Sequence, residues 1–512
     1  MKSTMSRALI SIFIVVFLAS CTRRVMYLSP TEVARLSAQS RIEVETTDGA
    51  TVELRNAKIE NRTLIGTTEK QGPVRLDFSS IKSARIERID KTGLGLAIVL
   101  TGAAVVLAWL AIEAENAPSP PPAKCCPFIY AYDGESYHLD AEPFGASFCE
   151  GLKRAEWTVM EHLAETDGGY RVLLANELRE TQYTDELSLL VVDHPAGLRV
   201  VPDASGGLHT ISALQPPRSA RNSYGEDLLP LISRRDGLPW QTDLERVDPE
   251  VRESLRDELT FDFQKPAGAR TAKLLVNAST SLWGAQMGER FLSLYGDSLP
   301  DWYSEVDRHG PAWFKTMVWQ SREEMNLLQI RVLTKNGWKT KGLIYGGEPF
   351  VSTDKAYALD IGDVPGETLT VRLTPPANFW SIDHLAVDYT LDSPVSVIEV
   401  EPNPGVRPKG PDDTAALKET DGSYLVMAEG CDPMGLSFAA PPAVPGTART
   451  VILKASGYYD IHVQCAGLQP QRDLLRRFGS EHGSAIQFSM KEYLAWQAGQ
   501  AANPRAAQKI VN

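Results

Sequence analysis

The chain has 512 residues, of which 43% are hydrophobic and 23% are charged, and its formal net charge is −13. This composition is typical of globular protein, and the length is enough for several domains. The acidic balance argues against non-specific binding of nucleic acid, because such binding needs a basic surface.

The first residues have the layout of an export signal. Positively charged residues precede an uncharged apolar segment, residues 8–20, which is too short to span a bilayer as a helix. Cys21 directly follows Leu18-Ala19-Ser20, and this order resembles the lipobox of bacterial lipoproteins. The resemblance implies cleavage before Cys21 and lipidation of its thiol. It places the protein in the bacterial cell envelope as a membrane-anchored lipoprotein, at the outer membrane or on the periplasmic side of the inner membrane.

The other cysteines are candidates for disulfide bonds, because an exported compartment permits them. Two pairings, Cys126–Cys149 and Cys431–Cys465, each lie within one local segment. Buried free thiols are the alternative.

Residues 41–91 alternate apolar and charged positions between turn signals such as Asp48-Gly49, which predicts a series of short strands. Closure into a small barrel would remove exposed strand edges. The pattern resembles Sm-like and SH3-like barrels. Because the segment has no basic, aromatic-rich loop, we expect a structural or interaction role for it and not RNA binding.

Residues 93–112 contain no charged residue and no proline, and a stretch of this length can span a bilayer. The sequence therefore predicts an apolar, transmembrane-like helix; a very apolar core helix is the alternative. Gly95 and Gly102 would let such helices approach closely, so self-association through residues 93–112 is expected. The basic residues before this segment conflict with a cleaved export signal under the positive-inside rule. The side of the membrane on which the large domain lies therefore stays open.

From residue 125 onward, turn signals such as Asp236-Gly237 separate short strands, and helical periodicity is scarce apart from a surface helix expected over residues 248–258. The predicted fold class is mainly β: a small barrel, one transmembrane-like helix, and one or two antiparallel β-sandwich units. Residues 359–389 are similar to galactose-binding-like jelly rolls. The region as a whole is similar to uncharacterised β-rich regions of bacterial lipoproteins, a resemblance that implies no activity.

The expected organisation follows the chain from signal to tail. Its parts are a signal peptide (1–20), a lipidated N-terminus with a short helix (21–40), a small β-barrel (41–91), an apolar helix (92–113), a Pro-rich linker (114–124), a large β-sandwich region (125–400), a second linker (401–420), a C-terminal β segment (421–490), and a helix with a disordered tail (491–512).

The sequence contains none of the established catalytic or metal-binding motifs that we sought, namely His-Glu-x-x-His, Gly-x-Ser-x-Gly and a phosphate-binding Gly-rich loop. We therefore expect no catalytic residue, no metal and no cofactor. Asp383-His384, close to Trp380, is the most suggestive pair. Adjacent residues of a strand point to opposite faces, however, so the sequence favours a structural role for this pair.

Aromatic residues in loop-prone segments are better candidates for binding, because exposed rings stack on sugars or anchor protein partners. Packing in a sandwich core is the alternative. The candidates are Trp283, Trp302, Phe379 and Trp380.

The sequence as a whole favours a non-catalytic binding or assembly module of the envelope. The expected partners are membrane lipid and envelope protein or glycan, and not nucleic acid. An envelope carbohydrate hydrolase and a subunit of an oligomeric envelope complex are the alternatives. Two carboxylates that converge in an aromatic-lined cleft would favour the hydrolase.

Overall fold

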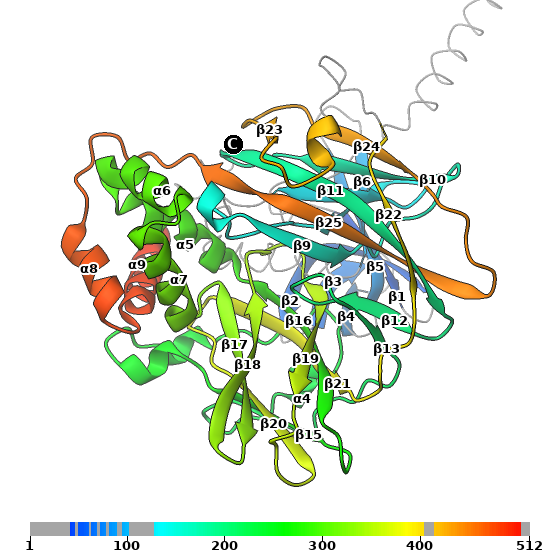
Figure 1. The fold of residues 1–512 in the computed structure, drawn as a ribbon, viewed down its shortest axis with the longest axis horizontal. Coiled ribbons are helices and arrows are strands. Elements are labelled where there is room, and N and C mark those ends of the chain that lie inside the picture. The colour runs from blue at the N-terminus through cyan, green and yellow to red at the C-terminus, as the bar shows by residue number, and fades with distance from the viewer. Residues whose placement is uncertain are drawn as a thin grey trace, which may run out of the picture.

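A computed structural model describes residues 41–46, 50–60, 63–68, 72–77, 81–89, 95–101, 127–403 and 414–502. Its strands form several antiparallel sheets, and the helices gather on one side of them (Figure 1). The prediction of a mainly β, antiparallel fold is therefore confirmed. The export signal, Cys21 and the Pro-rich linker lie outside the described residues.

The N-terminal strands form one antiparallel sheet. Its order is β4 (Gly72–Asp77), β3 (Thr63–Thr68), β2 (Thr51–Glu60), β1 (Arg41–Thr46), β5 (Ile81–Ile89) and β6 (Gly95–Thr101). The described pairings form an open path, so closure into a barrel stays a prediction.

Strand β6 corrects the expectation of a transmembrane-like helix over residues 92–113. Its residues pair antiparallel with β5, from Ser83 opposite Thr101 to Ile89 opposite Gly95. An apolar run fits a strand or a helix equally well by pattern, and here the neighbouring β5 supplies the hydrogen-bond partners. Residues 95–101 therefore form no helix whose glycines could support the expected self-association. Residues 102–113 lie outside the described part of the chain.

Among the residues that the structure describes, no helix is both long and apolar enough to cross a membrane.

Two sheets pack face to face to form a first sandwich. Their inner faces share one hydrophobic core, which includes Phe128, Val172, Leu189 and Leu453. One sheet has the order β24 (Met434–Ala439), β10 (Gly169–Ala175), β7 (Phe128–Tyr132), β8 (Tyr137–Ala141). The other has the order β22 (Ser396–Val400), β11 (Glu180–Pro195), β25 (Thr447–Ile461), β9 (Arg154–Val159), with β23 (Leu425–Met427) also paired to β11.

A second sandwich is built in the same way from the middle of the chain, around a core that includes Phe261, Leu274, Val371 and Trp380. Its larger sheet has the order β14 (Ser219–Arg221), β15 (Leu259–Gln264), β20 (Thr368–Leu373), β17 (Leu327–Thr334), β18 (Gly337–Tyr345). Its smaller sheet has the order β19 (Thr353–Asp360), β16 (Thr271–Thr280), β21 (Trp380–Asp388). A separate hairpin joins β12 (Arg199–Pro202) to β13 (Leu208–Ile211).

Helices cover one end of the second core. Trp283 and Met287 of α5 and Ile486 and Met490 of α9 are buried in it. The α-helices are α4 (Leu229–Ile232), α5 (Leu282–Ser293), α6 (Leu299–Asp307), α7 (Pro311–Glu323), α8 (Arg472–Ser480) and α9 (Ser484–Ala502). The 3-10 helices are η2 (Glu150–Leu152), η3 (Leu244–Arg246), η4 (Arg252–Leu255), η5 (Gly296–Ser298) and η6 (Thr414–Leu417).

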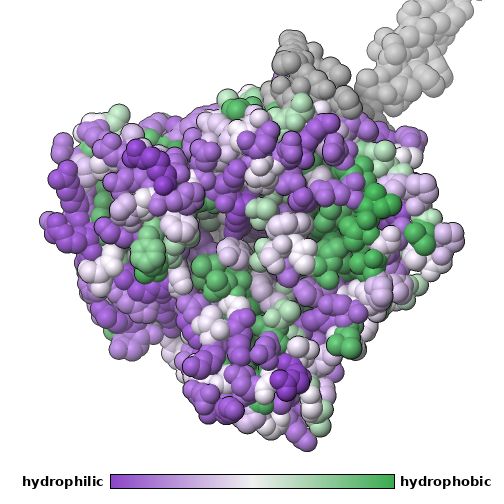
Figure 2. All heavy atoms as spheres, in the orientation of Figure 1, coloured by the Kyte–Doolittle hydropathy of each residue, from purple (hydrophilic) through white to green (hydrophobic). Residues whose placement is uncertain are grey.

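One strand leaves apolar side chains exposed. Val397 and Ile398 lie on β22, at the edge of its sheet, and are 45% and 42% exposed. Figure 2 shows hydrophobic residues gathered on the side of the molecule where Figure 1 places β22. The remainder of this face is largely hydrophilic.

The two sandwiches meet at a close backbone contact. Gly145 follows β8 in the first sandwich, and Gly347 lies between β18 and β19 in the second. A Cβ atom on Gly145 would overlap the carbonyl oxygen of Gly347. The residues that flank Gly145, Phe144 and Ala146, both have positive φ, at 46° and 62°. Such angles are costly for residues with side chains, so surrounding contacts must hold this loop in place.

Buried carboxylates supply those contacts. Oε2 of Glu142 accepts hydrogen bonds of 2.7 Å from the backbone N–H groups of both Phe350 and Val351 in the second sandwich. Oε2 of Glu156 accepts a 2.9 Å bond from the N–H of Phe144. Each carboxylate therefore fixes a loop that lies at the contact.

Cations from both sandwiches meet at Glu156. Its oxygens lie 3.0 Å from Nη2 of Arg154 and 3.3 Å from Nζ of Lys355. Burial opposes ionisation, but these charges outweigh it and hold the pKa of the Glu156 carboxyl below its ordinary value. Burial and the negative charge of Glu156 raise the pKa of the Glu348 carboxyl well above its ordinary value. Glu156 is therefore the charged member of this pair.

We predict that Gly145→Ala destabilises the protein by about 1–3 kcal/mol or more, because the added methyl group has no space against Gly347. Urea unfolding at constant pH measures the effect. The matched control is Gly435→Ala in β24, where an added Cβ meets no atom within 4 Å. Equal stability of the two variants would contradict the tight contact.

Candidate functional site

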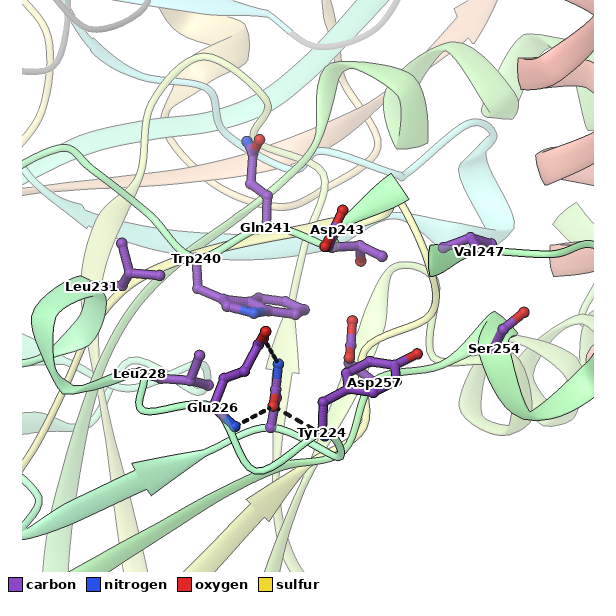
Figure 3. Close-up of a pocket in the computed structure, with 12 residues that line it drawn as sticks. Tyr224, Glu226, Leu228, Leu231, Trp240, Gln241, Asp243, Val247, Ser254 and Asp257 are labelled. Atoms are coloured by element: carbon purple, nitrogen blue, oxygen red, sulfur yellow. Dashed lines mark hydrogen bonds between the residues drawn. The ribbon is translucent and has the colours of Figure 1, made fainter. Parts of the chain in front are cut away.

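A cavity of about 200 Å³ lies beside the second sandwich and is lined by both apolar and polar side chains. The buried Trp240 forms its floor, and Leu228, Leu231 and Val247 add apolar surface. Figure 3 shows the Trp240 indole among the lining residues, with the carboxylate of Glu226 directed toward it. The polar lining residues are Asn222, Tyr224, Glu226, Gln241, Thr242, Asp243, Ser254 and Asp257.

A tight turn after β14 forms one wall of the Trp240 pocket. The side-chain Oδ1 of Asn222 accepts hydrogen bonds of 3.0 Å from the backbone N–H groups of both Tyr224 and Glu226. Gly225, between them, has φ of +80°. This side-chain mimicry of a backbone turn is the usual role of Asn, and Gly supplies the left-handed conformation. The turn presents the 52% exposed Tyr224 at the rim.

Arg246 connects the two walls of the pocket. Its guanidinium lies 2.5 Å from Oε1 of Glu226 and 3.0 Å from Oδ2 of Asp243. The same group stacks over the Tyr224 ring, 4.7 Å from the ring centroid. An exposed ion pair of this kind adds little stability, but three partners together fix the position of the rim.

Two carboxyl groups of the pocket have pKa values that move in opposite directions. Burial raises the pKa of Asp257 to about 6; a hydrogen bond from Ser223 opposes the shift, and the negative charges of Asp243 and Glu226 add to it. The hydrogen bond from Asn222, followed by that from Arg246, lowers the pKa of Glu226. Near neutral pH the pocket therefore holds one firmly ionised carboxylate beside one that readily takes a proton.

The floor of the pocket is attached to strand β21. Trp240 exchanges two backbone hydrogen bonds with Ile382, of 2.7 and 3.0 Å. The Gln241 side chain donates a 2.7 Å bond to Oγ of Ser381. The backbone N–H of Gly237 donates a 3.0 Å bond to Oδ2 of Asp383.

The structure places Asp383 and His384 at an irregularity in β21. Asn277 of β16 lies opposite His384 and Ala278 opposite Ile382, so Asp383 is the extra residue of a β-bulge. The alternation argument from the sequence does not hold at a bulge. Both residues are buried, and Asp383 contacts the pocket floor through Gly237. His384 carries its imidazole in a position where burial lowers the pKa.

Most of the aromatic residues proposed from sequence as a binding surface are core residues. Phe379 and Trp380 are each 1% exposed, and the Trp380 indole donates a 2.8 Å hydrogen bond to the carbonyl of Glu324. Trp283 is buried, donates to Oγ of Ser489, and packs against Tyr493 of α9. The prediction that these three rings are available for binding is therefore wrong, because the second core and helix α9 cover them.

Trp302 is half-buried in helix α6. Its ring lies 5.1 Å from that of Tyr295 and 5.4 Å from that of Tyr303, centroid to centroid. It therefore belongs to an aromatic cluster on the helical side of the molecule, and the structure does not bring it to the Trp240 pocket.

The predicted pairings Cys126–Cys149 and Cys431–Cys465 are not formed in the structure, because each contains a cysteine that is a free thiol. Cys126 lies outside the described residues, and Cys149 and Cys465 are free thiols. The segments that carry Cys431 and Cys465 do lie together, since Nδ1 of His462 is 2.8 Å from Oε2 of Glu429. Burial and the nearby charge of Asp307 raise the pKa of the Cys149 thiol, so this cysteine is a poor nucleophile.

Sequence reasoning did not find the pocket residues. The surface helix expected over residues 248–258 is reduced to the short η4, and Asp257 instead donates its backbone N–H to Pro375. The turn signals around Asn222 and Gly225 were visible in the sequence. What was not visible is that this turn would face Trp240, because tertiary contacts bring them together.

We predict that Asp257→Asn raises stability at pH 7.5 but not at pH 4. A carboxyl whose pKa is raised by folding stabilises the folded state below the unfolded value near 4, and this contribution is lost as pH rises through about 6. The expected gain in the free energy of unfolding at pH 7.5 is at most about 3 kcal/mol. Thermal unfolding at both pH values measures it, with Asp473→Asn, an exposed position on α8 outside the pocket, as control. A gain at pH 4 equal to that at pH 7.5 would contradict the assigned shift.

No protein-family model matches the sequence, and no curated protein matches it. The functional assignment therefore depends on the geometry of the Trp240 pocket.

Proposed function

We propose that this protein is a membrane-anchored lipoprotein of the bacterial envelope that binds a small polyhydroxylated ligand, such as one sugar unit of an envelope glycan, in the Trp240 pocket. One observation carries the proposal: aromatic rings and carboxylate side chains border the same cavity.

The lining matches both surfaces of a sugar ring. The C–H face of a pyranose is apolar and packs on aromatic surface, which the 52% exposed Tyr224 supplies at the rim, together with the part of the largely buried Trp240 that lines the cavity. Its hydroxyl groups both donate and accept hydrogen bonds, and the Asp243 and Asp257 carboxylates and the Thr242 hydroxyl are among the polar groups of the lining.

The size of the pocket supports a small ligand. Its volume of about 200 Å³ lies below the roughly 300 Å³ at which pockets for drug-sized ligands begin. A single ring fits such a volume, and a longer glycan would need to continue across the rim formed by Tyr224 and Arg246.

We predict that N-acetylglucosamine or another envelope monosaccharide binds with an affinity that Tyr224→Ala weakens by about tenfold, or ~1.4 kcal/mol. Trp240→Phe keeps an aromatic ring at this position of the core, and we expect it to weaken the affinity more than Tyr224→Ala does. Saturation-transfer NMR against a panel of envelope sugars measures binding. Phe314→Ala on α7 removes a ring outside the pocket that is 65% exposed, against 52% for Tyr224, and is the matched control. Binding that persists in both pocket variants would contradict the proposal, as would a panel in which no sugar binds.

A glycoside hydrolase is the second candidate, and the opposite pKa shifts of Asp257 and Glu226 favour it. Hydrolases of this class use one protonated and one ionised carboxyl group. In the same panel, longer glycans would then release reducing ends, and Asp257→Asn and Glu226→Gln would each abolish the release. Binding without release leaves the non-catalytic module as the function.

The membrane anchor is tested separately. We predict that Cys21→Ser moves the protein from the membrane fraction to the soluble fraction, because the lipidated thiol is lost. Radiolabelled palmitate incorporation and fractionation measure this outcome. Unchanged membrane association with no incorporated lipid in the native protein would contradict the lipobox assignment.

A further inference from the structure

We propose that Asp383 is a positioning residue for the Trp240 pocket: its carboxylate, displaced into the bulge of β21, fixes the floor segment and couples ligand affinity to its own protonation. The inference deepens the proposed function and rests on it for the ligand, but not for the movement of the floor.

The floor segment has three attachments to β21. Gly237 bonds to the Asp383 side chain, Trp240 to the Ile382 backbone, and Gln241 to the Ser381 side chain. The second attachment is neutral and backbone to backbone, and the third joins an amide to a hydroxyl. Only the attachment at Asp383 involves an ionisable group.

The bulge is what gives Asp383 this position. In a regular strand, Asp383 would be paired with a residue of β16, but the register passes from Asn277–His384 to Ala278–Ile382 without it. A bulge re-aims the side chain of its extra residue. The Asp383 carboxylate is thereby free to accept from the loop that leads into the pocket.

The charged and titratable groups near Asp383 come from the floor loop, from β21 itself and from ion pairs beside it, whereas the facing residues of β16, Asn277 and Ala278, are uncharged. Asp236 and Arg235 come from the floor loop, and His384 is its neighbour on β21. Arg235 pairs in turn with Glu161 and lies 3.9 Å from Oδ2 of Asp354 on β19. Arg199 of β12 also pairs with Asp354, at 2.5 Å.

Burial and these charged neighbours together place the pKa of Asp383 in the mildly acidic range. Burial raises its pKa to about 6; the charge of Asp236 adds to the shift, and the backbone hydrogen bonds from Gly237 and Asp236 and the charge of Arg235 oppose it. Hydrogen bonds to an ionised acceptor are roughly twice as strong as neutral ones. Protonation therefore weakens the hold on Gly237 and loosens the segment that carries Trp240.

The first measurement follows the environment of Trp240 by NMR in the protein without a ligand. The full chain is labelled with 5-fluorotryptophan, and the Trp240 resonance is assigned with Trp240→Phe. All variants carry Asp257→Asn, because Asp257 also titrates near pH 6 within the pocket. We expect the Trp240 resonance to shift with a midpoint near pH 6, and we expect Asp383→Asn to remove this shift while keeping an acceptor for Gly237.

N-acetylglucosamine affinity should fall about threefold from pH 7.5 to pH 5 with Asp383 present and stay constant with Asp383→Asn.

Asp460→Asn is the matched control, since burial also raises the pKa of Asp460 to about 6 but this residue lies on β25 of the first sandwich. Loss of the Trp240 titration in this control, or its persistence in Asp383→Asn, would overturn the inference. A Trp240 titration that depends on Asp383 in a protein that binds no sugar would support the inference and reject the proposed ligand. If Asp383→Asn fails to fold, the midpoint in Asp236→Asn decides, because removing that negative charge should lower it.

Discussion

Buried carboxylates at the contact between the two sandwiches are the constraint on which the arrangement of the fold depends. Glu142 accepts from the backbone N–H groups of Phe350 and Val351, and Glu156 accepts from that of Phe144, whose φ is positive. Arg154 and Lys355 neutralise Glu156 from the two sandwiches. Removing a cation from Glu156 leaves an uncompensated charge in the interior, which costs several kcal/mol. The loops at Gly145 and Gly347 can approach closely because this network holds them.

The same principle operates on a smaller scale at the proposed binding site. The pocket has no regular strand or long helix of its own on its floor side; the segment from Gly237 to Gln241 is irregular and takes its position from β21. Strand β21 is buried along its whole length, pairs with β16 on one side, and forms isolated bridges to Trp240 and Gln215. A rigid strand therefore positions a loop that carries the functional side chains, which is the usual division between scaffold and site.

Acidic groups that titrate near pH 6 recur in this protein, at Asp257, Asp383 and Asp460. Burial is the main cause of the raised pKa of each carboxyl, and none of the three has a cation close enough to outweigh it. Glu156, in contrast, has such cations and a lowered pKa. The difference explains why Glu156 serves as a permanent structural charge, whereas Asp257 and Asp383 are suited to exchange protons. A pocket that combines Asp257 with the ionised Glu226 supports both the proposed binding role and the hydrolytic alternative.

The sequence by itself determined the β class of the fold, because alternation and turn signals such as Asp236-Gly237 are local properties of the chain. It also determined the lipobox resemblance at Cys21. It misjudged residues 95–101 as helix, since an apolar run carries no signal of its strand partner β5. Trp380 and Trp240 look alike in sequence, yet one is sealed in the core and the other lines a cavity. Only the tertiary structure decided this, because a bulge, the packing of helices and the pairing of distant segments depend on contacts between residues far apart in the chain.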